Sequence, residues 1–300
     1  MQIVHFDVDS EIAKYLSGPK VHTSINQDFS EDMKFAECIS IKIGSQADKK
    51  TLEKFPDLKL LVTRTVGVDH IDLDYCFSRG VTVQNIPDYG AFNIAEHAFA
   101  MLLYGCRNIA SSQLDVKSGN FTFEGHLSYA LKGKKIGVVG TGRIGLEMIK
   151  RAKGFEMEVL AFDIHKKEEA AIDHGFRYVS LEELLKNVDI LSLHAPATTE
   201  THHLITSKEL ELMKSGSIIL NTARGDLINT EALIKNIKKF RFVGLDVLEN
   251  EKNFDMNNPL LKFENVLITP HMAFYSDLSV KEIARETNRL IEEYLLEKQG

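Results

Sequence analysis

The segment that most constrains the fold is a glycine-rich turn between an apolar stretch and the start of a helix. Residues 136–145 read Ile-Gly-Val-Val-Gly-Thr-Gly-Arg-Ile-Gly, the order expected of a buried strand that runs through a G-x-G-x-x-G turn into a helix. Gly140 permits the tight turn, Gly142 lets the backbone approach a pyrophosphate, and Gly145 lets the helix pack closely on the strand. Because free N–H groups at a helix start bind phosphates, the pattern predicts a dinucleotide-binding unit.

The next predicted strand ends at an acid that suits a ribose. Asp163 directly follows Val159–Phe162 and lies 23 residues after Gly140, close to the ~20 expected. A carboxylate there accepts hydrogen bonds from a ribose 2′-hydroxyl and repels a 2′-phosphate, so NAD is predicted over NADP. His165 and Lys166 lie nearby and could tolerate a phosphate, which leaves NADP open. The alternative to both is a glycine turn in an α/β domain that binds no cofactor.

Short β-branched stretches alternate with helical patterns along the chain, which predicts an α/β architecture with parallel sheets. The first series of predicted strands is Ile3–Phe6, Cys38–Ile43, Leu58–Val62 and Val81–Gln84. The second series is Ile136–Val139, Val159–Phe162, Phe176–Val179, Ile190–Leu193, Ser217–Leu220, Phe242–Leu245 and Val266–Ile268. Six or seven strands joined by helices make a doubly wound sheet.

Several of the predicted helices carry their own start motifs. The capping-box pairs are Asn93 with Glu96, Ser180 with Glu183 and Thr206 with Glu209. The last helix is predicted to start at Ser279, and Ser10–Leu16 is predicted as a helix near the N-terminus. The least periodic stretch, Asn120–Leu131, is predicted to be a loop between domains.

Composition limits the partners and the compartment. The chain has 36 Lys and Arg against 43 Asp and Glu, a net charge of −7, so it has no general attraction for nucleic acid or anionic membranes. The longest apolar stretches, such as Ala98–Tyr104, are too short to span a bilayer, and the N-terminus reads as a strand rather than a signal peptide. The three cysteines match neither a disulfide framework nor a zinc site, so we expect a cytoplasmic protein in a reducing compartment.

Three of the predicted strands lead into polar side chains. Arg224 lies just past one strand, Asp246 ends the next with Glu251 five residues on, and His271 ends a third. The carboxyl ends of strands in an open α/β sheet are where ligands bind. Histidine is the usual proton donor near neutral pH, a carboxylate can orient its ring, and arginine can clamp a carboxylate and polarise a carbonyl. Each residue alone has a structural explanation, but together they predict carbonyl reduction.

The remaining histidines predict no metal site. His194 and the adjacent His202 and His203 lack a third ligand at suitable spacing. We expect a solvated or structural role for the adjacent pair and a buried place for His97 on its helix.

From about Leu58 to the end, these motifs resemble those of the D-2-hydroxyacid dehydrogenase family and follow in that family's order. The stretches that carry the resemblance are Thr63–Asp72, Asn85–Tyr89, Ala95–Ala98, the glycine turn, His194–Pro196, Asn221–Gly225, Leu245–Glu251 and Thr269–His271. Val66–Asp69, Tyr89 and His271–Tyr275 are most similar to the D-lactate dehydrogenase branch.

The resemblance implies a role for each motif. Arg224 would bind the substrate carboxylate and carbonyl, Glu251 would pair with the imidazole, and His271 would donate the proton. The residues implied in substrate binding are Val66 and Gly67, through backbone N–H groups, Tyr89, Phe274 and Tyr275. Those implied in cofactor binding, besides the glycines, are Arg143, Ile144, Asp163, Ala195, Pro196, Thr201, Thr222, Ala223 and Asp246.

The resemblance also implies two doubly wound parallel-sheet domains. Residues 1–98 and 274–300 would form a flavodoxin-like substrate domain, and residues 99–273 a Rossmann NAD-binding domain inserted into it. Because family members are commonly dimers through the dinucleotide domain, a homodimer is expected. The implied reaction is the reduction of pyruvate to D-lactate with NADH. Two alternatives stay open: a reductase of another 2-oxo acid (branched, aromatic, glyoxylate or hydroxypyruvate), and a non-catalytic NADH-sensing regulatory protein.

Three features depart from the family pattern. Glu251 is followed by Lys252, where the family usually has proline, and the stretch from Glu251 to His271 is short. The chain is also shorter than most relatives. The first departure could loosen the loop that carries Glu251.

Overall fold

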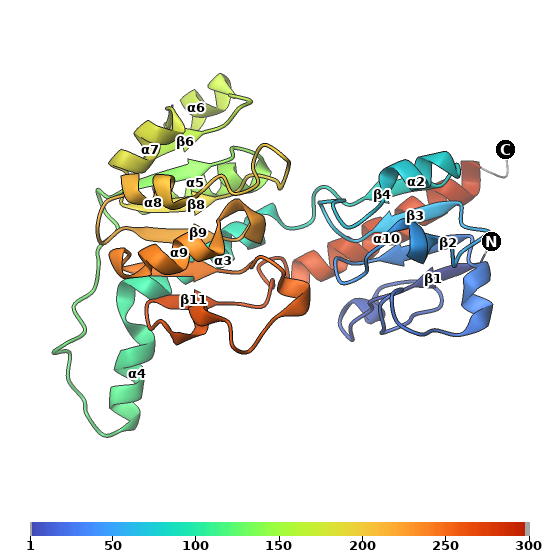
Figure 1. Cartoon of the computed structure of the whole chain (residues 1–300), viewed down its shortest axis with the longest axis horizontal. Helices are drawn as coiled ribbons and strands as arrows, with labels where there is room; N and C mark the ends of the chain where they lie inside the picture. The colour runs from blue at the N-terminus through green and yellow to red at the C-terminus, as the bar shows by residue number, and fades with distance from the viewer. Residues whose placement is uncertain (1, 298–300) are drawn as a thin grey trace. The chain divides into compact units, whose positions relative to one another are not determined.

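The structure is a computed structural model that describes residues 2–297, with the backbone alone at Lys252. The chain folds into two compact units. The first unit consists of the residues up to Gly90 together with those from Tyr275 onward, and the second of Ala91–Phe274. Each is built around a parallel sheet (Figure 1), which confirms the predicted fold class.

The first unit contains a four-stranded parallel sheet in the order β1-β2-β3-β4. Its strands are β1 (Ile3–His5), β2 (Cys38–Ile41), β3 (Leu60–Thr63) and β4 (Thr82–Asn85). Every residue of β2 and β3 is buried, because other segments of the unit pack on both faces of the sheet. On one face Leu60 packs with Ile291 of α10 (Asp277–Glu297), and Leu61, which points to the other face, packs with Phe55. The short helices are α1 (Lys49–Leu52), α2 (Leu73–Ser78), and the 3₁₀ turns η1 (Ile12–Lys14) and η2 (Glu31–Phe35).

Two helix predictions in this unit are wrong. The predicted helix Ser10–Leu16 is a single 3₁₀ turn, η1. Asp9 Oδ1 accepts the N–H groups of Glu11 and Ile12 at its start, but the chain soon turns at Gly18 (φ +98°) and Pro19, which leaves no room for a longer helix. The last helix, α10, starts at Asp277 rather than at Ser279. Ser279 is buried in the helix, and its hydroxyl donates a hydrogen bond to the carbonyl of Tyr89 (2.9 Å) instead of capping the helix.

The second unit contains a seven-stranded parallel sheet in the order β11-β10-β9-β8-β5-β6-β7. Its strands are β5 (Lys135–Val139), β6 (Glu158–Phe162), β7 (Arg177–Tyr178), β8 (Ile190–Leu193), β9 (Ile218–Asn221), β10 (Phe242–Leu245) and β11 (Val266–Ile268). The chain builds outward from β5 to β7 and then returns to place β8 on the other side of β5. The carboxyl ends of β5 and β8 are therefore the switch point of the sheet, where ligands of such folds bind.

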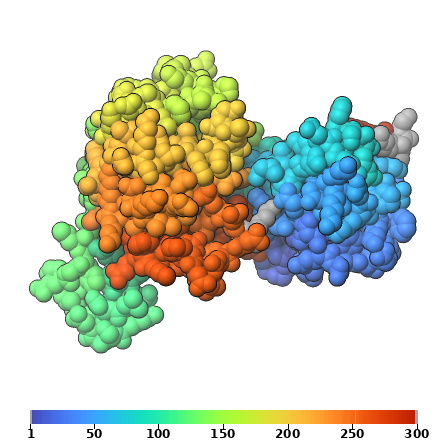
Figure 2. Space-filling model, viewed as in Figure 1, coloured from blue at the N-terminus to red at the C-terminus, as the bar shows by residue number. Residues whose placement is uncertain are grey.

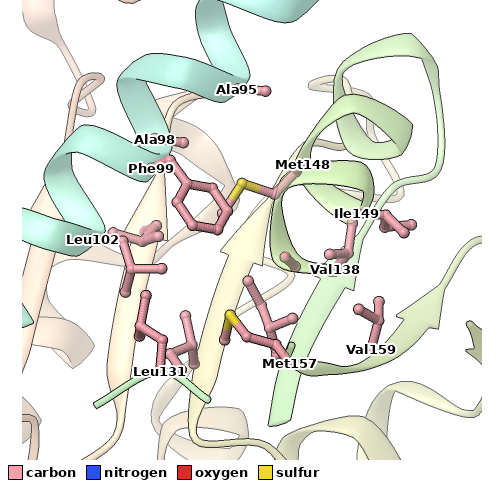
Figure 3. Packing of buried hydrophobic residues seen from close by; sticks show 14 of the residues in the cluster. Ala95, Ala98, Phe99, Leu102, Leu131, Val138, Met148, Ile149, Met157 and Val159 are labelled. Atoms are coloured by element: carbon pink, nitrogen blue, oxygen red, sulfur yellow. The ribbon is translucent and has the colours of Figure 1, made fainter. Parts of the chain in front are cut away.

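Helices cover both faces of this sheet. One face packs against α3 (Ala91–Arg107) and α5 (Arg143–Gly154), and Figure 3 shows Phe99 of α3 beside Met148 of α5. A Cβ on Gly105 would lie 2.3 Å from the ring of Phe242, so this glycine lets α3 approach β10 closely. The other face packs against α7 (Leu181–Asn187), α8 (Ser207–Leu212) and α9 (Thr230–Asn236). The helix α6 (Glu168–His174), which follows β6, packs through Ala171 in the same core as α3 and α5.

The predicted helix starts in this unit are partly right. The capping box of Thr206 and Glu209 is confirmed at the start of α8, and the Ser180 side chain caps α7. The box at Asn93 is wrong, because α3 already begins at Ala91 and Asn93 is buried within its first turn. There tertiary packing decides the boundary.

One segment of the second unit projects from the rest. α4 (Ile109–Lys117) contains no buried residue, and the chain that follows it returns to the unit near Leu131 (Figures 1 and 2). Asn120–Leu131 thus belongs to this projection and not, as predicted, to a loop between domains. We call residues 108–130 the arm.

Within residues 2–297, no helix is both long and apolar enough to cross a membrane. Over the same described range, no group of three or more His, Cys, Asp or Glu side chains is placed to hold a metal ion. The cysteines Cys38, Cys76 and Cys106 are buried and unpaired.

Candidate active site

The glycine turn lies at the carboxyl end of β5, at the switch point of the second sheet. Gly140 has a φ of +92°, which favours glycine, and a Cβ here would lie 2.7 Å from the backbone nitrogen of Ala195. A Cβ on Gly145 would lie 1.9 Å from the Gly140 carbonyl oxygen, so α5 packs directly on the turn. A Cβ on Gly142 would meet nothing within 4 Å. The open backbone before α5 therefore fits a pyrophosphate.

Asp163 lies at the carboxyl end of β6, next to this turn. Its Oδ2 accepts hydrogen bonds from the Thr141 N–H (2.6 Å) and hydroxyl (2.9 Å), and its Oδ1 accepts one from the His165 N–H (2.8 Å). Burial raises the pKa of the Asp163 carboxyl, but these hydrogen bonds outweigh burial and hold the pKa below its usual value. The ionised carboxylate is thus fixed beside the turn, as a ribose-binding acid requires. Sequence reasoning missed Thr141, whose hydroxyl also lies 2.7 Å from that of Tyr178.

Two buried polar atoms near the turn have no hydrogen-bond partner among the described residues. They are Nδ1 of His194, directly after β8, and Oγ1 of Thr222, directly after β9. His194 Nε2 lies 2.8 Å from the Ser192 hydroxyl, and burial lowers the pKa of His194 to about 4, so its ring is neutral. A buried polar atom without a partner costs about 1–3 kcal/mol. Both atoms therefore fit contacts to the polar groups of a dinucleotide.

The other predicted cofactor residues lie at the same edge of the sheet. The Thr201 hydroxyl donates to the Pro196 carbonyl (2.6 Å) and closes the loop after β8. The Ala223 N–H donates to Asn221 Oδ1 (3.0 Å) and shapes the loop after β9. The rest of this group is Arg143 and Ile144, in the first turn of α5, and Ala195, which follows His194.

Glu251 and His271 form a close pair at the end of β11. His271 Nδ1 and Glu251 Oε1 are 2.6 Å apart, and both side chains are partly buried. His271 has a φ of +51°, a conformation uncommon for a residue other than glycine. The carboxylate fixes the ring orientation and holds the proton of Nδ1, so Nε2 is the nitrogen that can exchange a proton with a ligand.

Asp246, at the end of β10, holds the turn that carries His271. Its Oδ1 accepts hydrogen bonds from the Thr269 hydroxyl (2.5 Å) and the Met272 N–H (3.0 Å), its Oδ2 accepts one from the Ala273 N–H (2.9 Å), and its carbonyl accepts the His271 N–H (2.8 Å). These contacts stabilise the left-handed backbone of His271. Both oxygens of the Asp246 carboxylate accept hydrogen bonds from this turn. The predicted contact of Asp246 with the cofactor stays a prediction.

His97 completes this network from α3. Its Nε2 lies 3.0 Å from the Thr269 hydroxyl and 3.5 Å from Asp246 Oδ1. Burial raises the pKa of the Asp246 carboxyl, but the hydrogen bonds of His97 and Thr269 and the N–H groups outweigh it and hold the pKa below its usual value. His97 therefore has a defined polar role that its sequence pattern did not indicate.

Arg224 lies just past the end of β9, next to β10. Its Nη1 donates to the Ala223 carbonyl (2.8 Å), and its own carbonyl accepts a hydrogen bond from Asn221 Nδ2 (2.8 Å). Since β9, β10 and β11 are neighbours in one parallel sheet, Arg224, Glu251 and His271 follow the carboxyl ends of adjacent strands. The fold thus gathers a cation and a histidine–carboxylate pair at the edge that holds the glycine turn.

The residues predicted to bind substrate are divided between the units. Val66, Gly67, Tyr89 and Tyr275 belong to the first unit, and Phe274 to the second. In the first unit, the loop after β3 is braced by its neighbours: Asn85 Nδ2 donates to the Val66 carbonyl (2.6 Å), and the Thr65 hydroxyl donates to the Gly67 carbonyl (2.6 Å). With these carbonyls engaged, the N–H groups of the loop are the side of its backbone that suits an anion.

Two tyrosines of the first unit differ in exposure. Tyr89 is buried, whereas Tyr275 is 39% exposed. The Tyr275 hydroxyl donates to Asp9 Oδ1 (2.9 Å), and burial together with this carboxylate raises the pKa of Tyr275 to about 12. Its hydroxyl is therefore neutral and directed to Asp9, and its ring lies 5.7 Å from the Lys42 ammonium.

The known proteins that this chain resembles are dinucleotide-dependent enzymes and the domains that bind the dinucleotide. The model of the family described as D-isomer specific 2-hydroxyacid dehydrogenase, NAD binding domain, matches residues 99–273. A glyoxylate reductase of Thermococcus litoralis is 39% identical over 251 residues, which cover 81% of this chain and 75% of that one. An aromatic 2-oxoacid reductase of Clostridium sporogenes is 36% identical over 275 residues, 86% of this chain and 82% of that one. The structure of a D-lactate dehydrogenase from Aquifex aeolicus, complexed with NAD and lactic acid, superposes with a TM-score of 0.88 at 36% identity and covers 98% of this chain and 95% of that one.

The fold and these strand ends define an α/β oxidoreductase that uses a dinucleotide. The chain belongs to the D-isomer-specific 2-hydroxyacid dehydrogenase family. It is an NAD-dependent enzyme that acts on 2-hydroxy acids, and NAD(H) is its cofactor.

Proposed function

We propose that this enzyme is a D-lactate dehydrogenase, which interconverts pyruvate and D-lactate. The observation that carries the chemistry is the Glu251–His271 pair, 2.6 Å apart, at the sheet edge that also holds Arg224 and the glycine turn. The choice of substrate is supported by the likeness to the Aquifex aeolicus D-lactate dehydrogenase over nearly the whole chain.

In this proposal each side chain performs one part of a carbonyl reduction. Bound NADH supplies the hydride. Arg224 binds the substrate carboxylate and polarises the ketone, and His271 Nε2 gives its proton to the oxygen as the alcohol forms. Glu251 holds the ring by Nδ1 and stabilises the charge that the ring carries before transfer. In the oxidation direction the same nitrogen takes the proton back.

The other residues predicted to bind substrate supply the remaining contacts in this proposal. The N–H groups of Val66 and Gly67 bind the substrate carboxylate, and Tyr89 contacts it from the next loop. Phe274 and Tyr275 form an apolar wall beside the substrate methyl group, which favours a small or apolar side chain. We assign substrate binding to the first unit and NAD binding to the second. The predicted boundary after residue 98 falls inside α3, which packs as a whole in the core of the second unit, so the boundary lies at Ala91.

A second candidate is a reductase of a larger or a smaller 2-oxo acid. It is favoured by the two relatives that are named for glyoxylate and for aromatic 2-oxoacids. The test is the loss of NADH absorbance with pyruvate, glyoxylate, hydroxypyruvate, a branched 2-oxo acid and phenylpyruvate, with the chirality of the product determined. Fastest turnover of pyruvate to D-lactate supports the proposal, and fastest turnover of another acid replaces the substrate. NADH binding without turnover of any acid would point to a sensor.

Asp163 is expected to select NAD. Changing Asp163→Ser removes hydrogen bonds between a charged acceptor and the ribose, so we expect KM for NADH to rise about 10- to 100-fold. KM for NADPH should change less or fall, since the repulsion of the 2′-phosphate is lost. Asp163 also anchors Thr141, so a general disturbance of the turn would weaken both cofactors equally. An unchanged ratio of NADH to NADPH efficiency would remove Asp163 from the ribose site.

We further propose that the enzyme is a homodimer through the arm. Three of its large apolar side chains are almost fully exposed: Phe121 at 92%, Phe123 at 87% and Leu127 at 88%. An apolar surface of this kind marks an interface. The double variant Phe121→Asp/Phe123→Asp is expected to sediment as a monomer and the unchanged chain as a dimer. Phe77→Asp, at an equally exposed phenylalanine of α2 (87%), is the matched control and should stay dimeric.

The cysteines support our proposal of a reducing, cytoplasmic compartment. Cys38, Cys76 and Cys106 are buried and unpaired, and burial raises the pKa of Cys38 to about 12 and of Cys106 to about 11. Thiols of this kind are inert core residues. Localisation of a tagged chain in intact cells tests the proposal.

A further inference from the structure

A second histidine–carboxylate pair lies in the second unit, apart from Glu251 and His271. His203 Nε2 and Glu249 Oε1 are 2.6 Å apart, and both side chains are partly buried. Glu249 Oε2 also accepts a hydrogen bond from the N–H of Thr230, the first residue of α9 (2.7 Å). Both oxygens of this carboxylate are therefore engaged. Burial raises its pKa, but the Thr230 and His203 contacts outweigh burial and keep the pKa below its usual value.

The His203 end of this pair is fixed to the loop that follows Arg224. The His203 N–H donates to the Asp226 carbonyl (2.7 Å), and Asn229 Nδ2 lies 3.3 Å from His203 Nδ1. Since an amide nitrogen can only donate, Nδ1 accepts and the proton of the ring lies on Nε2, which donates to Glu249. The ring of His202 stacks on His203, with 3.9 Å between centroids.

The Glu249 end lies two residues before Glu251. Asn250 between them has a φ of +55°, and the Leu248 N–H lies 3.4 Å from Glu251 Oε2. The two carboxylates on either side of Asn250 thus have separate partners: Glu249 contacts His203, and Glu251 contacts His271.

The two loops also touch backbone to backbone. A Cβ on Gly225 would lie 2.0 Å from the carbonyl carbon of Leu248 and 2.3 Å from the nitrogen of Glu249. The loop that carries Arg224 and the loop that carries Glu251 therefore cannot shift independently. The His203–Glu249 pair joins them by a side-chain contact at the same place.

We propose that His203 and Glu249 are positioning residues, which hold the loop of Glu251 where Glu251 reaches His271. The inference rests on the proposed function of that pair. A loop freed from this contact lets the Glu251 carboxylate move relative to the imidazole, and misplacement of a catalytic group by about 1 Å can cost about 100-fold in rate. The His202–His203 dipeptide thus gains a specific role for its second member.

The test compares Glu249→Ala with Glu231→Ala. Glu231 is an exposed glutamate in the first turn of α9 and serves as the matched control. We expect Glu249→Ala to lower kcat about 10- to 100-fold, to leave the KM for NADH unchanged and to move the alkaline limb of the pH–rate profile. The control should match the unchanged enzyme in all three. Glu249→Gln, which keeps the size of the side chain, should show a smaller change in the same direction and guards against misfolding of the alanine variant.

A second readout does not depend on turnover. The NMR titration of the His271 imidazole, assigned with His271→Gln, is expected to change its midpoint in Glu249→Ala and to keep it in Glu231→Ala. An unchanged midpoint overturns the inference, even if kcat falls, because the loss would then be only structural. If the unchanged enzyme turns over none of the 2-oxo acids, the proposed function fails, and the titration still decides the positioning role.

The double variant tests that the two residues act together. His203→Gln combined with Glu249→Ala should lose no more activity than the more damaging single change, because either change already breaks the contact. Losses that multiply would mean that the residues act separately and would overturn the proposal.

Discussion

Replacing His271 with glutamine is expected to lower kcat by about 10²- to 10⁴-fold, the range that general acid catalysis contributes. The amide cannot carry the proton that the ketone oxygen needs, so the proton must come from water. NADH binding should persist, because the glycine turn and Asp163 lie on β5 and β6, whereas His271 follows β11. The measurements are steady-state reduction of pyruvate and NADH fluorescence titration.

The pH dependence separates this role from a structural one. In the unchanged enzyme the rate of reduction should fall as the pH rises and the donor loses its proton, and in His271→Gln this limb should disappear. Glu251→Gln should keep the limb and lose part of the rate, since it weakens the contact at 2.6 Å without removing the donor. His174→Gln, at the last residue of α6, is the control and should behave as the unchanged enzyme. Near-native turnover by His271→Gln would exclude His271 as the acid.

Replacing Arg224 with glutamine is expected to lower kcat by about 10²- to 10³-fold and to raise the KM for the 2-oxo acid. The rate falls because a charged donor that stabilises the developing negative charge on oxygen is lost. The KM rises because the substrate carboxylate loses its counter-ion. Arg224→Lys should recover little, since an ammonium cannot match the two-pronged geometry of a guanidinium on a carboxylate.

Oxamate resembles a 2-oxo acid but is not reduced, so its affinity measures the contribution of Arg224 to substrate binding separately from the rate of reduction. Its affinity for the NADH complex should fall strongly in Arg224→Gln and stay unchanged in His271→Ala if the histidine mainly serves proton transfer. The matched control is Arg177→Gln. Arg177 is an exposed arginine at the start of β7, and it forms an ion pair with Glu183. If oxamate binds Arg224→Gln as tightly as the unchanged enzyme, Arg224 does not hold the carboxylate.

Much of the fold follows from local patterns. The strands β8, β10 and β11 have the predicted boundaries, because each is a short apolar run bounded by polar residues. β8 and β10 are buried throughout, whereas β11, at the edge of the sheet, is partly buried. Helix starts are less predictable. Thr206 caps α8 as its motif indicates, but Asn93, which has the same kind of motif, and Ser279, the predicted start of the last helix, lie inside longer helices. A cap motif states what a residue can do, and packing decides whether the helix ends there.

The candidate site shows the same division. Arg224, Glu251 and His271 stood out because each follows an apolar strand, and parallel strands bring their carboxyl ends to one edge. The roles of the residues that hold Asp163 and Asp246 were not predicted. His97, Thr141 and Thr269 lie inside motifs that the sequence marked, but their contacts with Asp246 or Asp163 were not predicted, because a single polar residue has no pattern that names its partner.

The sequence by itself determined the α/β class, the dinucleotide turn with its acid, and the polar strand ends, because each depends on residues that are close together in the chain. The tertiary structure alone decided which strands are neighbours, and therefore that β9, β10 and β11 present their ends side by side. It also decided the left-handed backbone of His271, which Asp246 stabilises, and the contact of His203 with Glu249 across 46 positions. These features depend on hydrogen bonds between residues that only folding brings within 3 Å of each other, and no local pattern encodes such a distance.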